Sequence, residues 1–173
     1  GERVLDLAAG AGGKSLALAA DMQNRGEIVA SDIDGKRLSA FEPRLVRAGV
    51  TIVRLHVLRG DPPEGPFDLV FVDAPCSGSG VWRRQPELKW RIDEPRLAEL
   101  MSVQDRLLDQ AATRVAPGGR LVYATCSILP RENEDRIVAF MARHPRFRMV
   151  SLAAPCAEMG LPTPDDFFRA SPY

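Results

Sequence analysis

The chain has 173 residues, which is enough for one domain with a single substantial core. Its apolar and charged fractions, 45% and 27%, are typical of globular proteins, and no apolar run reaches the roughly 20 residues of a membrane helix. Three cysteines are too few for a disulfide framework and favour a reducing, cytoplasmic location, while a formal net charge of zero provides no overall attraction for nucleic acid.

Strands and helices alternate along the first half of the chain. Apolar runs predict strands at residues 4–7, 28–32 and 51–55, and helical spacing of apolar residues predicts helices at 14–22 and 35–48. Gly49 is suited to end the second helix in a left-handed conformation. Pro43 lies inside that helix, where it removes a hydrogen bond, so we expect a kink there.

The alternation continues in the second half. Strands are predicted at residues 67–72, 120–124 and 147–152, with helices at 96–115 and 132–143 and an irregular, proline-rich tail beyond Leu152. This order is typical of an α/β fold, a mostly parallel sheet with helices on both faces. We interpret residues 1–173 as one domain.

Two cysteines follow strand ends. Cys76 lies in the motif Asp-Ala-Pro-Cys-Ser-Gly, which begins at Asp73 after the strand at 67–72, and Cys126 lies in Thr-Cys-Ser after the strand at 120–124. Parallel strands end at the same edge of a sheet, where ligands bind. Each cysteine alone is equally well explained as a small buried apolar residue. Together, and beside a carboxylate, they indicate thiol chemistry in one pocket.

A glycine-rich turn, from Gly10 to Ser15, follows the first strand and has three interpretations. A phosphate-binding P-loop fails because Ala8 stands where that motif has its first glycine. A dinucleotide fingerprint, as in nicotinamide-dependent oxidoreductases, is disfavoured because Ser15 stands at its third glycine. An S-adenosylmethionine site fits best, since small residues admit the cofactor closely and a helix N-terminus favours its carboxylate.

Acidic residues after three strands complete this predicted cofactor site. Asp32 could accept hydrogen bonds from both ribose hydroxyls, Asp61 could lie near the adenine, and Asp73 precedes the first cysteine motif. Each carboxylate alone would be ordinary in a solvated loop. The turn and the three carboxylates together favour the cofactor.

These motifs resemble those of the cytosine-C5 RNA methyltransferases of the NOL1/NOP2/Sun family, especially the bacterial Sun-type enzymes that modify small-subunit ribosomal RNA. The match runs from about Val4 to Phe147. It is carried by the Pro-Cys motif at Cys76, the Thr-Cys-Ser motif at Cys126 and the Glu-Asn-Glu motif that starts at Glu132. The resemblance implies the Rossmann-like fold of S-adenosylmethionine-dependent methyltransferases.

The family's glycine motif usually reads Asp-x-Cys-Ala-Ala-Pro-Gly-Gly-Lys-Thr, and this chain departs from it. Ala8, Gly10 and Ala11 stand where the family has Cys, Ala and Pro. Losing the proline loosens the turn, so the departure bears on cofactor affinity, while backbone groups still line the cradle. The predicted cofactor site comprises Ala8, Ala9, Gly10, Ala11, Gly12, Gly13, Lys14, Asp32, Asp61 and Asp73.

Methylation at carbon 5 of cytosine calls for covalent catalysis, because that carbon is a poor nucleophile. A thiolate that adds at carbon 6 turns the ring into an enamine, which can attack a sulfonium methyl group. The resemblance implies that Cys126 is this nucleophile and that Cys76 assists the later release of the carbon-5 proton. Asp73 is placed to hydrogen-bond the N3/N4 edge of the ring.

The resemblance also implies an RNA substrate, ribosomal RNA rather than transfer RNA, whose target base leaves its stack. Candidate phosphate and stacking contacts follow the Pro-Cys motif: Arg83, Arg84, Lys89 and Trp90. Alternatively, they pack on a preceding RNA-binding region. We expect that region, and the family's last strand, to be absent, because the chain opens directly on a strand and stops after residues 170–173.

No metal site is predicted, because His56 and His144 lack metal-ligating companions, and Cys156 in the tail matches no motif. The leading hypothesis is an S-adenosylmethionine-dependent RNA cytosine-C5 methyltransferase. A second hypothesis is a catalytically silent RNA-binding ribosome-assembly factor with the same fold. The altered glycine turn favours the second hypothesis, whereas retention of both motif cysteines and their neighbouring aspartate favours the first.

Overall fold

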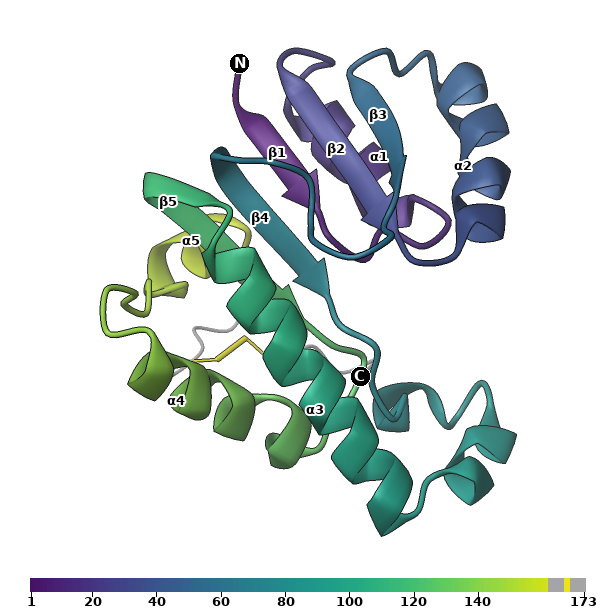
Figure 1. Ribbon diagram of the computed structural model, residues 1–173, viewed down its shortest axis with the longest axis vertical. Coiled ribbons are helices and arrows are strands. Elements are labelled where there is room, and N and C mark those ends of the chain that lie inside the picture. Colours follow the sequence, from purple (N-terminus) through teal and green to yellow (C-terminus); the bar gives the residue numbers. More distant parts are fainter. Residues whose placement is uncertain (162–166, 169–173) are drawn as a thin grey trace.

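The computed structural model describes residues 1–161, 167 and 168. Its centre is a parallel sheet with the strand order β3-β2-β1-β4-β5 (Figure 1). The strands are β1 (Arg3–Asp6), β2 (Glu27–Asp32), β3 (Val53–Val57), β4 (Phe67–Asp73) and β5 (Val115–Ala124). The α-helices are α1 (Gly13–Asp21), α2 (Gly35–Ala48), α3 (Glu94–Ala112), α4 (Glu134–Arg143) and α5 (Ala153–Glu158). Short 3₁₀ turns are η1 (Ser79–Val81), η2 (Pro86–Arg91) and η3 (Pro130–Glu132).

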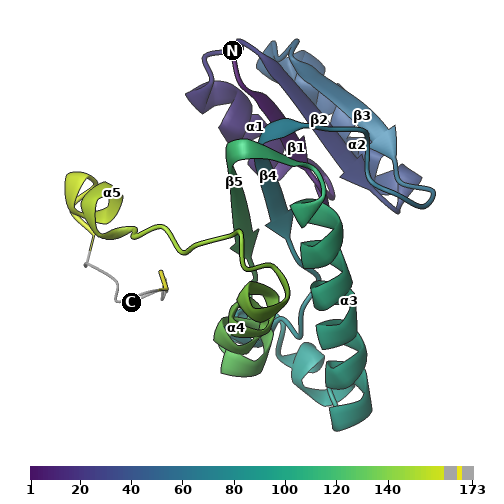
Figure 2. The ribbon, with the colours of Figure 1, turned by 60° about the vertical axis from the view of Figure 1, so that its left-hand side comes forward.

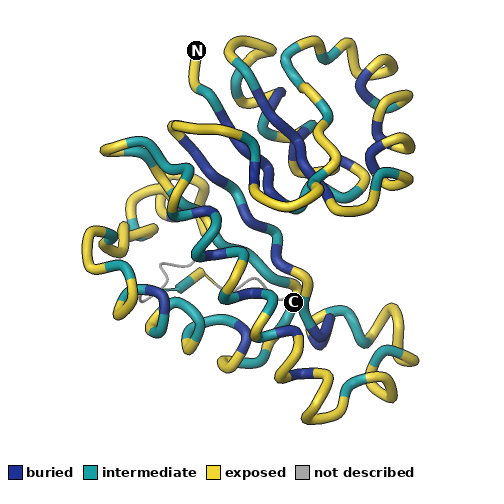
Figure 3. The backbone as a smooth tube through the Cα atoms, in the orientation of Figure 1, coloured by how far each residue is buried: buried dark blue, intermediate teal, exposed yellow. Residues whose placement is uncertain are grey.

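Helices cover both faces of the sheet, which confirms the predicted α/β class. Ile28 packs against α1 and Ala30 packs against Phe41 of α2. These two residues of β2 point to the same face because side chains alternate along a strand. The intervening Val29 belongs to the cluster that contains Ala111 of α3 on the opposite face. Buried residues follow the central strands β1, β2 and β4 (Figure 3).

The strand order reverses between β1 and β4. After β1 the chain adds β2 and β3 on one side, then crosses over to add β4 and β5 on the other. Open α/β sheets bind ligands at the carboxyl ends of strands beside such a switch point. Asp6 ends β1 and Asp73 ends β4, so the glycine turn and the Pro-Cys motif leave the sheet side by side.

The predicted sixth strand at residues 147–152 is wrong. This segment forms no strand, and α5 follows it in the tail that was expected to be irregular; Figure 2 shows α5 away from the sheet. Phe147 packs edge-on against Phe140 of α4, with ring centroids 5.2 Å apart, and Val150 is exposed. Alternating apolar residues form a strand only where a neighbouring strand satisfies their backbone groups. The expectation about the chain end at residues 170–173 lies outside the described residues.

Helix α2 continues through Pro43 from Gly35 to Ala48, and Gly49 ends it in the left-handed region with φ 63°. Phe41 and Leu45 are buried on either side of the exposed proline. Their burial holds this helix against the sheet despite the hydrogen bond that the proline removes.

Strand β5 starts earlier than predicted. Val115, which was expected in a helix, pairs with Phe67, and the Pro-Gly-Gly segment at 117–119 lies at an irregularity in the ladder. Helix α3 also starts earlier, because the Asp93 side chain caps it by accepting a hydrogen bond from the Arg96 backbone N–H at 2.8 Å.

Gly12 joins the glycine turn to α1 and leaves no room for a side chain. Its φ is +77°, and a Cβ atom there would lie 2.2 Å from ring atoms of Phe41. The Arg44 guanidinium donates a hydrogen bond to the Ala11 carbonyl. Helix α2 therefore packs directly on the turn.

Replacing Gly12 with alanine should destabilise the protein, because the new Cβ atom meets the Phe41 ring and the backbone stays in the left-handed region. We expect a loss of roughly 2–4 kcal/mol in urea unfolding. Gly13→Ala is the matched control, since Gly13 lies in α1 and a Cβ there meets nothing within 4 Å. Equal stability of the two variants would contradict this packing.

Candidate active site

Cys76 and Cys126 meet at the carboxyl ends of β4 and β5. The two strands pair in parallel with Asp73 opposite Ala124, so both cysteines lie in the loops just beyond that pair. Their Sγ atoms are 3.1 Å apart, which is within hydrogen-bond distance for sulfur. The structure therefore brings the two sequence-predicted thiols into one site.

The loop after Cys76 packs against the loop that carries Cys126. Gly80 N donates to the Cys126 carbonyl at 2.9 Å, and a Cβ atom at Gly80 would lie 2.7 Å from that oxygen. Ser79 Oγ accepts a hydrogen bond from Ile128 N at 2.9 Å and lies 3.0 Å from Ser127 Oγ. These contacts join the two loops.

The two thiols differ in protonation. The hydrogen bond from Cys76 lowers the pKa of Cys126 to about 7, against the opposing effects of burial and of the negative charge on Asp73. The same hydrogen bond, together with burial, raises the pKa of Cys76 well above its ordinary value. Cys126 is the more exposed of the two, so water stabilises the charge better there. As pH rises through about 7, the pair forms a Cys126 thiolate that accepts a hydrogen bond from the Cys76 thiol.

Asp73 connects the thiols with the glycine turn. Its carboxylate forms an ion pair with Lys14 Nζ, which projects from the first turn of α1. This pair bridges β4 and the β1–α1 turn across the switch point. The positive charge of Lys14 also offsets the repulsion between Asp73 and the Cys126 thiolate.

Asp32 holds the glycine turn from the end of β2. Its Oδ2 accepts a hydrogen bond from Gly10 N at 2.8 Å, and its Oδ1 accepts one from Asp34 N at 2.8 Å. A carboxylate offers about four acceptor positions, so Asp32 keeps capacity for a ligand hydroxyl.

The turn leaves space for a ligand at two of its glycines. A Cβ atom at Gly10 or Gly13 would meet nothing within 4 Å. The φ of +56° accounts for glycine at position 10, whereas neither the backbone nor packing within the protein requires glycine at position 13. Gly12 provides no side-chain cap to the nine-residue helix α1, whose first turn contains no acidic residue. Its N–H groups can receive an anionic group. These features fit the carboxylate and ribose of S-adenosylmethionine.

Sequence reasoning gave no role to Asp6, a buried carboxylate at the end of β1. Ser15 Oγ donates to its Oδ2 at 2.6 Å, whereas Oδ1 is buried without a partner among the described residues. Burial raises the pKa of Asp6 to about 6, with the Ser15 hydrogen bond opposing the rise. The signal in the sequence was an acidic residue within the first predicted strand, four residues before the glycine turn.

Asp61 lies in the exposed loop after β3. Leu58 N donates to the Asp32 carbonyl at 2.9 Å, so this loop begins beside Asp32. Asp61 itself forms no hydrogen bond or ion pair with the described residues. The structure does not join it to the other predicted site residues.

The residues predicted to contact RNA lie around η1 and η2. Trp90 is 84% exposed, and Lys89 Nζ lies 5.7 Å from the centroid of its ring. Arg83 and Arg84 are exposed in the same segment. The segment adjoins the thiols because η1 contains Gly80, which contacts the Cys126 backbone.

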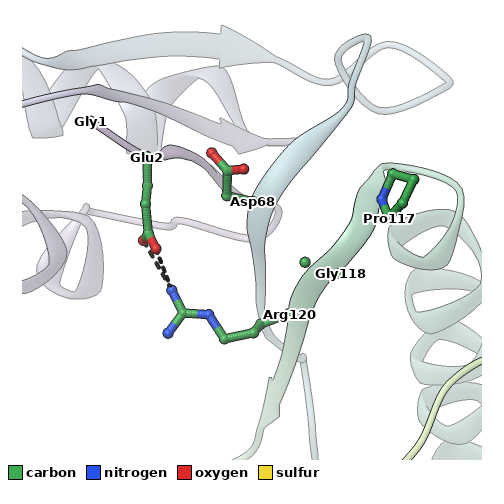
Figure 4. Close-up of a pocket in the computed structure, with 7 residues that line it drawn as sticks. Gly1, Glu2, Asp68, Pro117, Gly118 and Arg120 are labelled. Carbon is green, nitrogen blue, oxygen red and sulfur yellow. Dashed lines mark hydrogen bonds and ion pairs between the residues drawn. The ribbon is translucent and has the colours of Figure 1, made fainter.

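A polar hollow of about 500 Å³ lies at the other end of the sheet (Figure 4). It is lined by Gly1, Glu2, Asp68, Pro117, Gly118, Gly119 and Arg120. Two hydrogen bonds of 2.8 and 3.0 Å join Arg120 to the Glu2 carboxylate across it. Most of these residues lie toward the amino ends of β1, β4 and β5, so the hollow is separate from the thiol site.

Among the described residues, no cluster of three or more His, Cys, Asp or Glu side chains could hold a metal ion. No described helix is both long and apolar enough to cross a membrane. His144 stacks on Phe140, with ring centroids 4.6 Å apart, and lies 2.8 Å from an Asp109 carboxylate oxygen. His56 is exposed on β3, and Cys156 is buried in α5.

Comparison with known proteins identifies the family of the chain. The sequence profile of the 16S rRNA methyltransferase RsmB/F family matches residues 1–162. The chain belongs to this family. The chain is 40% identical to ribosomal RNA small subunit methyltransferase B of Klebsiella pneumoniae (strain 342). This match covers 98% of the chain and 41% of that protein. Ribosomal RNA small subunit methyltransferase B of Yersinia pseudotuberculosis serotype O:1b is 37% identical, over 98% of this chain and 42% of that protein. The chain thus spans about two fifths of the length of these relatives.

Solved structures share the RsmB/F fold. PH0851 gives a TM-score of 0.85 at 44% identity, over 90% of this chain and 36% of that chain. NSun6 from Pyrococcus horikoshii, in a structure with SFG, gives a TM-score of 0.72 at 32% identity, over 82% of this chain and 37% of that chain. These similarities confirm the NOL1/NOP2/Sun resemblance and the Rossmann-like methyltransferase fold.

Removing the Cys76 thiol should raise the pKa of Cys126, because the thiolate loses its hydrogen-bond donor. In the wild type the thiolate forms as pH rises through about 7. In Cys76→Ala we expect this pKa to rise toward that of a free cysteine, so Cys126 should be alkylated roughly tenfold more slowly at pH 7. Iodoacetamide labelling followed by peptide mass spectrometry measures this rate against pH, with buried Cys156 as an internal reference. An unchanged midpoint would contradict the hydrogen-bonded pair.

Proposed function

We propose that this chain carries the catalytic site of an S-adenosylmethionine-dependent methyltransferase that modifies carbon 5 of cytosine in ribosomal RNA. The observation that carries the proposal is the 3.1 Å approach of the Cys76 and Cys126 Sγ atoms in an RsmB/F family member. The named relatives are small-subunit ribosomal RNA methyltransferases, which favours ribosomal over transfer RNA. The proposal includes a cytoplasmic location, since its free thiols need a reducing compartment.

S-adenosylmethionine supplies an electrophilic methyl group when it is bound. Residues 8–14 would enclose its methionyl part, with the N–H groups at the start of α1 receiving the carboxylate. The spare acceptor positions of Asp32 suit the ribose hydroxyls, and Asp61 would lie toward the adenine. Asp73, held by Lys14, would border the side where the cofactor and the base meet.

Cys126 starts the proposed reaction as a thiolate. Its Sγ forms a bond to carbon 6 of cytosine. The electron pair of the C5–C6 double bond then forms a C4–C5 double bond while the C4–N3 pair moves onto N3, and this enamine makes carbon 5 nucleophilic. Asp73 accepts a hydrogen bond from the N4 amino group and thereby orients the ring. Lys14 offsets the negative charge that develops on that edge.

Cys76 then completes the proposed cycle after methyl transfer. Bond formation at Cys126 removes the charge that contributes to the raised pKa of Cys76, so Cys76 can lose its proton to water and act as a base. It takes the carbon-5 proton, the C–H electron pair re-forms the C5–C6 double bond, and the carbon 6–sulfur bond breaks. Cys126 leaves as a thiolate beside a Cys76 thiol, which is the starting state.

The exposed segment around η2 would hold the RNA. The target cytosine must leave its stack to reach Cys126, and the exposed Trp90 ring would stack on a base of the RNA. We propose that the neighbouring cations contact phosphates: Arg83, Arg84 and Lys89.

Cys76→Ser should trap a covalent protein–RNA complex, because methyl transfer still occurs but release of the carbon-5 proton fails. The complete protein is incubated with cellular RNA and S-adenosylmethionine, and a retarded band is sought on a denaturing gel. Cys76→Ser/Cys126→Ser is the control and should give no band.

A band in both variants would disprove Cys126 as the nucleophile. Absence of a band in the single variant, despite binding of both RNA and cofactor, would disprove the division of labour between the two cysteines. A band in the single variant alone supports the mechanism, and sequencing the trapped RNA identifies the substrate.

The catalytically silent assembly factor is the second candidate, and the altered glycine turn favours it. Calorimetric titration with S-adenosylmethionine separates the two, since the proposed enzyme must bind the cofactor. Asp32→Asn should weaken binding roughly tenfold or more, because the charged acceptor is lost. Asp34→Asn is the matched control, since asparagine caps α2 as well as aspartate does. A folded wild-type protein that binds RNA but no cofactor would favour the assembly factor.

A further inference from the structure

Glu132 is a carboxylate buried between the two cysteine loops, and the mechanism above does not use it. It ends η3, shortly after the Thr-Cys-Ser motif, and its relative exposure is 0%. Burying an ionised carboxylate is costly unless several donors satisfy it. Its partners therefore indicate what the burial achieves.

Among the described residues, the three donors to this carboxylate belong to the Cys76 side of the site or to α3. Oε1 accepts hydrogen bonds from Ser77 N at 2.8 Å and from Gln104 Nε2 at 3.0 Å. Oε2 accepts one from Ser77 Oγ. Gln104 Nε2 also donates to the Pro75 carbonyl at 2.9 Å, so the residues on both sides of Cys76 are held.

The Glu132 backbone is anchored on the Cys126 side. Tyr123, in the strand that leads to Cys126, donates from its hydroxyl to the Glu132 carbonyl at 2.8 Å. Ser77 Oγ also lies 3.3 Å from Ser127 Oγ, next to Cys126. One residue thus connects the Cys76 loop to the strand and loop that carry Cys126.

We propose that Glu132 is a positioning residue for both thiols: its buried carboxylate holds Ser77, and with it Cys76, at hydrogen-bond distance from Cys126. The importance of that distance rests on the proposed function. Ser77 donates to this carboxylate from both its backbone N–H and its hydroxyl, so two hydrogen bonds fix the residue next to Cys76.

Glu132 has two opposing effects on the pKa of Cys126, one from its charge and one from the position in which it holds Cys76. Three neighbouring groups act on Cys126: the Cys76 thiol by its hydrogen bond, and Asp73 of β4 and Glu132 of η3 by their negative charge. Lys14 of α1 forms an ion pair with Asp73. The negative charge of Glu132 raises the pKa of Cys126, whereas the Cys76 hydrogen bond that it maintains lowers that pKa. Two conservative substitutions therefore have opposite expected effects.

The test is thiol labelling of the complete protein with iodoacetamide at pH 6, read by peptide mass spectrometry. Glu132→Gln keeps the shape and removes the charge, so Cys126 should react roughly threefold faster than in the wild type. Glu132→Asp keeps the charge but shortens the reach, so Cys76 withdraws and Cys126 should react roughly threefold more slowly. Asp135→Asn, the same chemical change as the first at an exposed residue of α4, should leave the rate unchanged.

A faster labelling rate of Cys126 in Glu132→Gln and a slower one in Glu132→Asp support the proposal. A merely structural residue would lower the unfolding temperature in both variants without changing the two rates in opposite directions. Equal rates in both variants, or shifts in one direction, overturn it. If Glu132→Asp does not fold, Ser77→Ala removes one donor from the other side and should also slow Cys126. The labelling uses neither RNA nor cofactor, so its failure is distinct from failure of the covalent trap.

Discussion

Parallel pairing of β4 with both β1 and β5 is the constraint on which the site depends. The ladder places Asp73 opposite Ala124, and Ala74 N extends it with a 2.9 Å bond to the Ala124 carbonyl, so the next residues of both chains enter adjoining loops. The pairing of Asp6 with Phe71 brings the glycine turn beside the end of β4. A slip of one residue in either ladder would turn every β4 side chain to the opposite face and separate these groups.

Negative charge dominates this edge of the sheet, and a neutral group, the Cys76 thiol, stabilises the Cys126 thiolate. Asp73 and Glu132 both oppose ionisation of Cys126, and Lys14 is directed at Asp73. The pKa of Cys126 is nevertheless lowered, because a thiol at 3.1 Å donates to it. Ionisation of Cys126 therefore depends on the geometry of the two cysteine loops. The contacts that join these loops help to set the pKa of Cys126.

The glycine turn shows how tertiary contacts can act where a stiff residue is absent. Ala11 stands where the family has proline, yet the turn is held at three points. Asp32 accepts a hydrogen bond from Gly10 N, Arg44 donates to the Ala11 carbonyl, and the Phe41 ring packs against Gly12. A proline would restrain the backbone of the turn locally. Here, side chains of β2 and α2 provide that restraint.

The sequence by itself determined the α/β class, the cysteines at strand ends and the glycine turn, because these follow from local periodicity and motif spacing. It did not determine that residues 147–152 lack a strand partner, since Phe147 packs on α4 instead. Nor could it show the burial of Glu132 or the 3.1 Å approach of the thiols. Only the tertiary structure decided these features, because hydrogen-bond partners and burial depend on residues far apart along the chain.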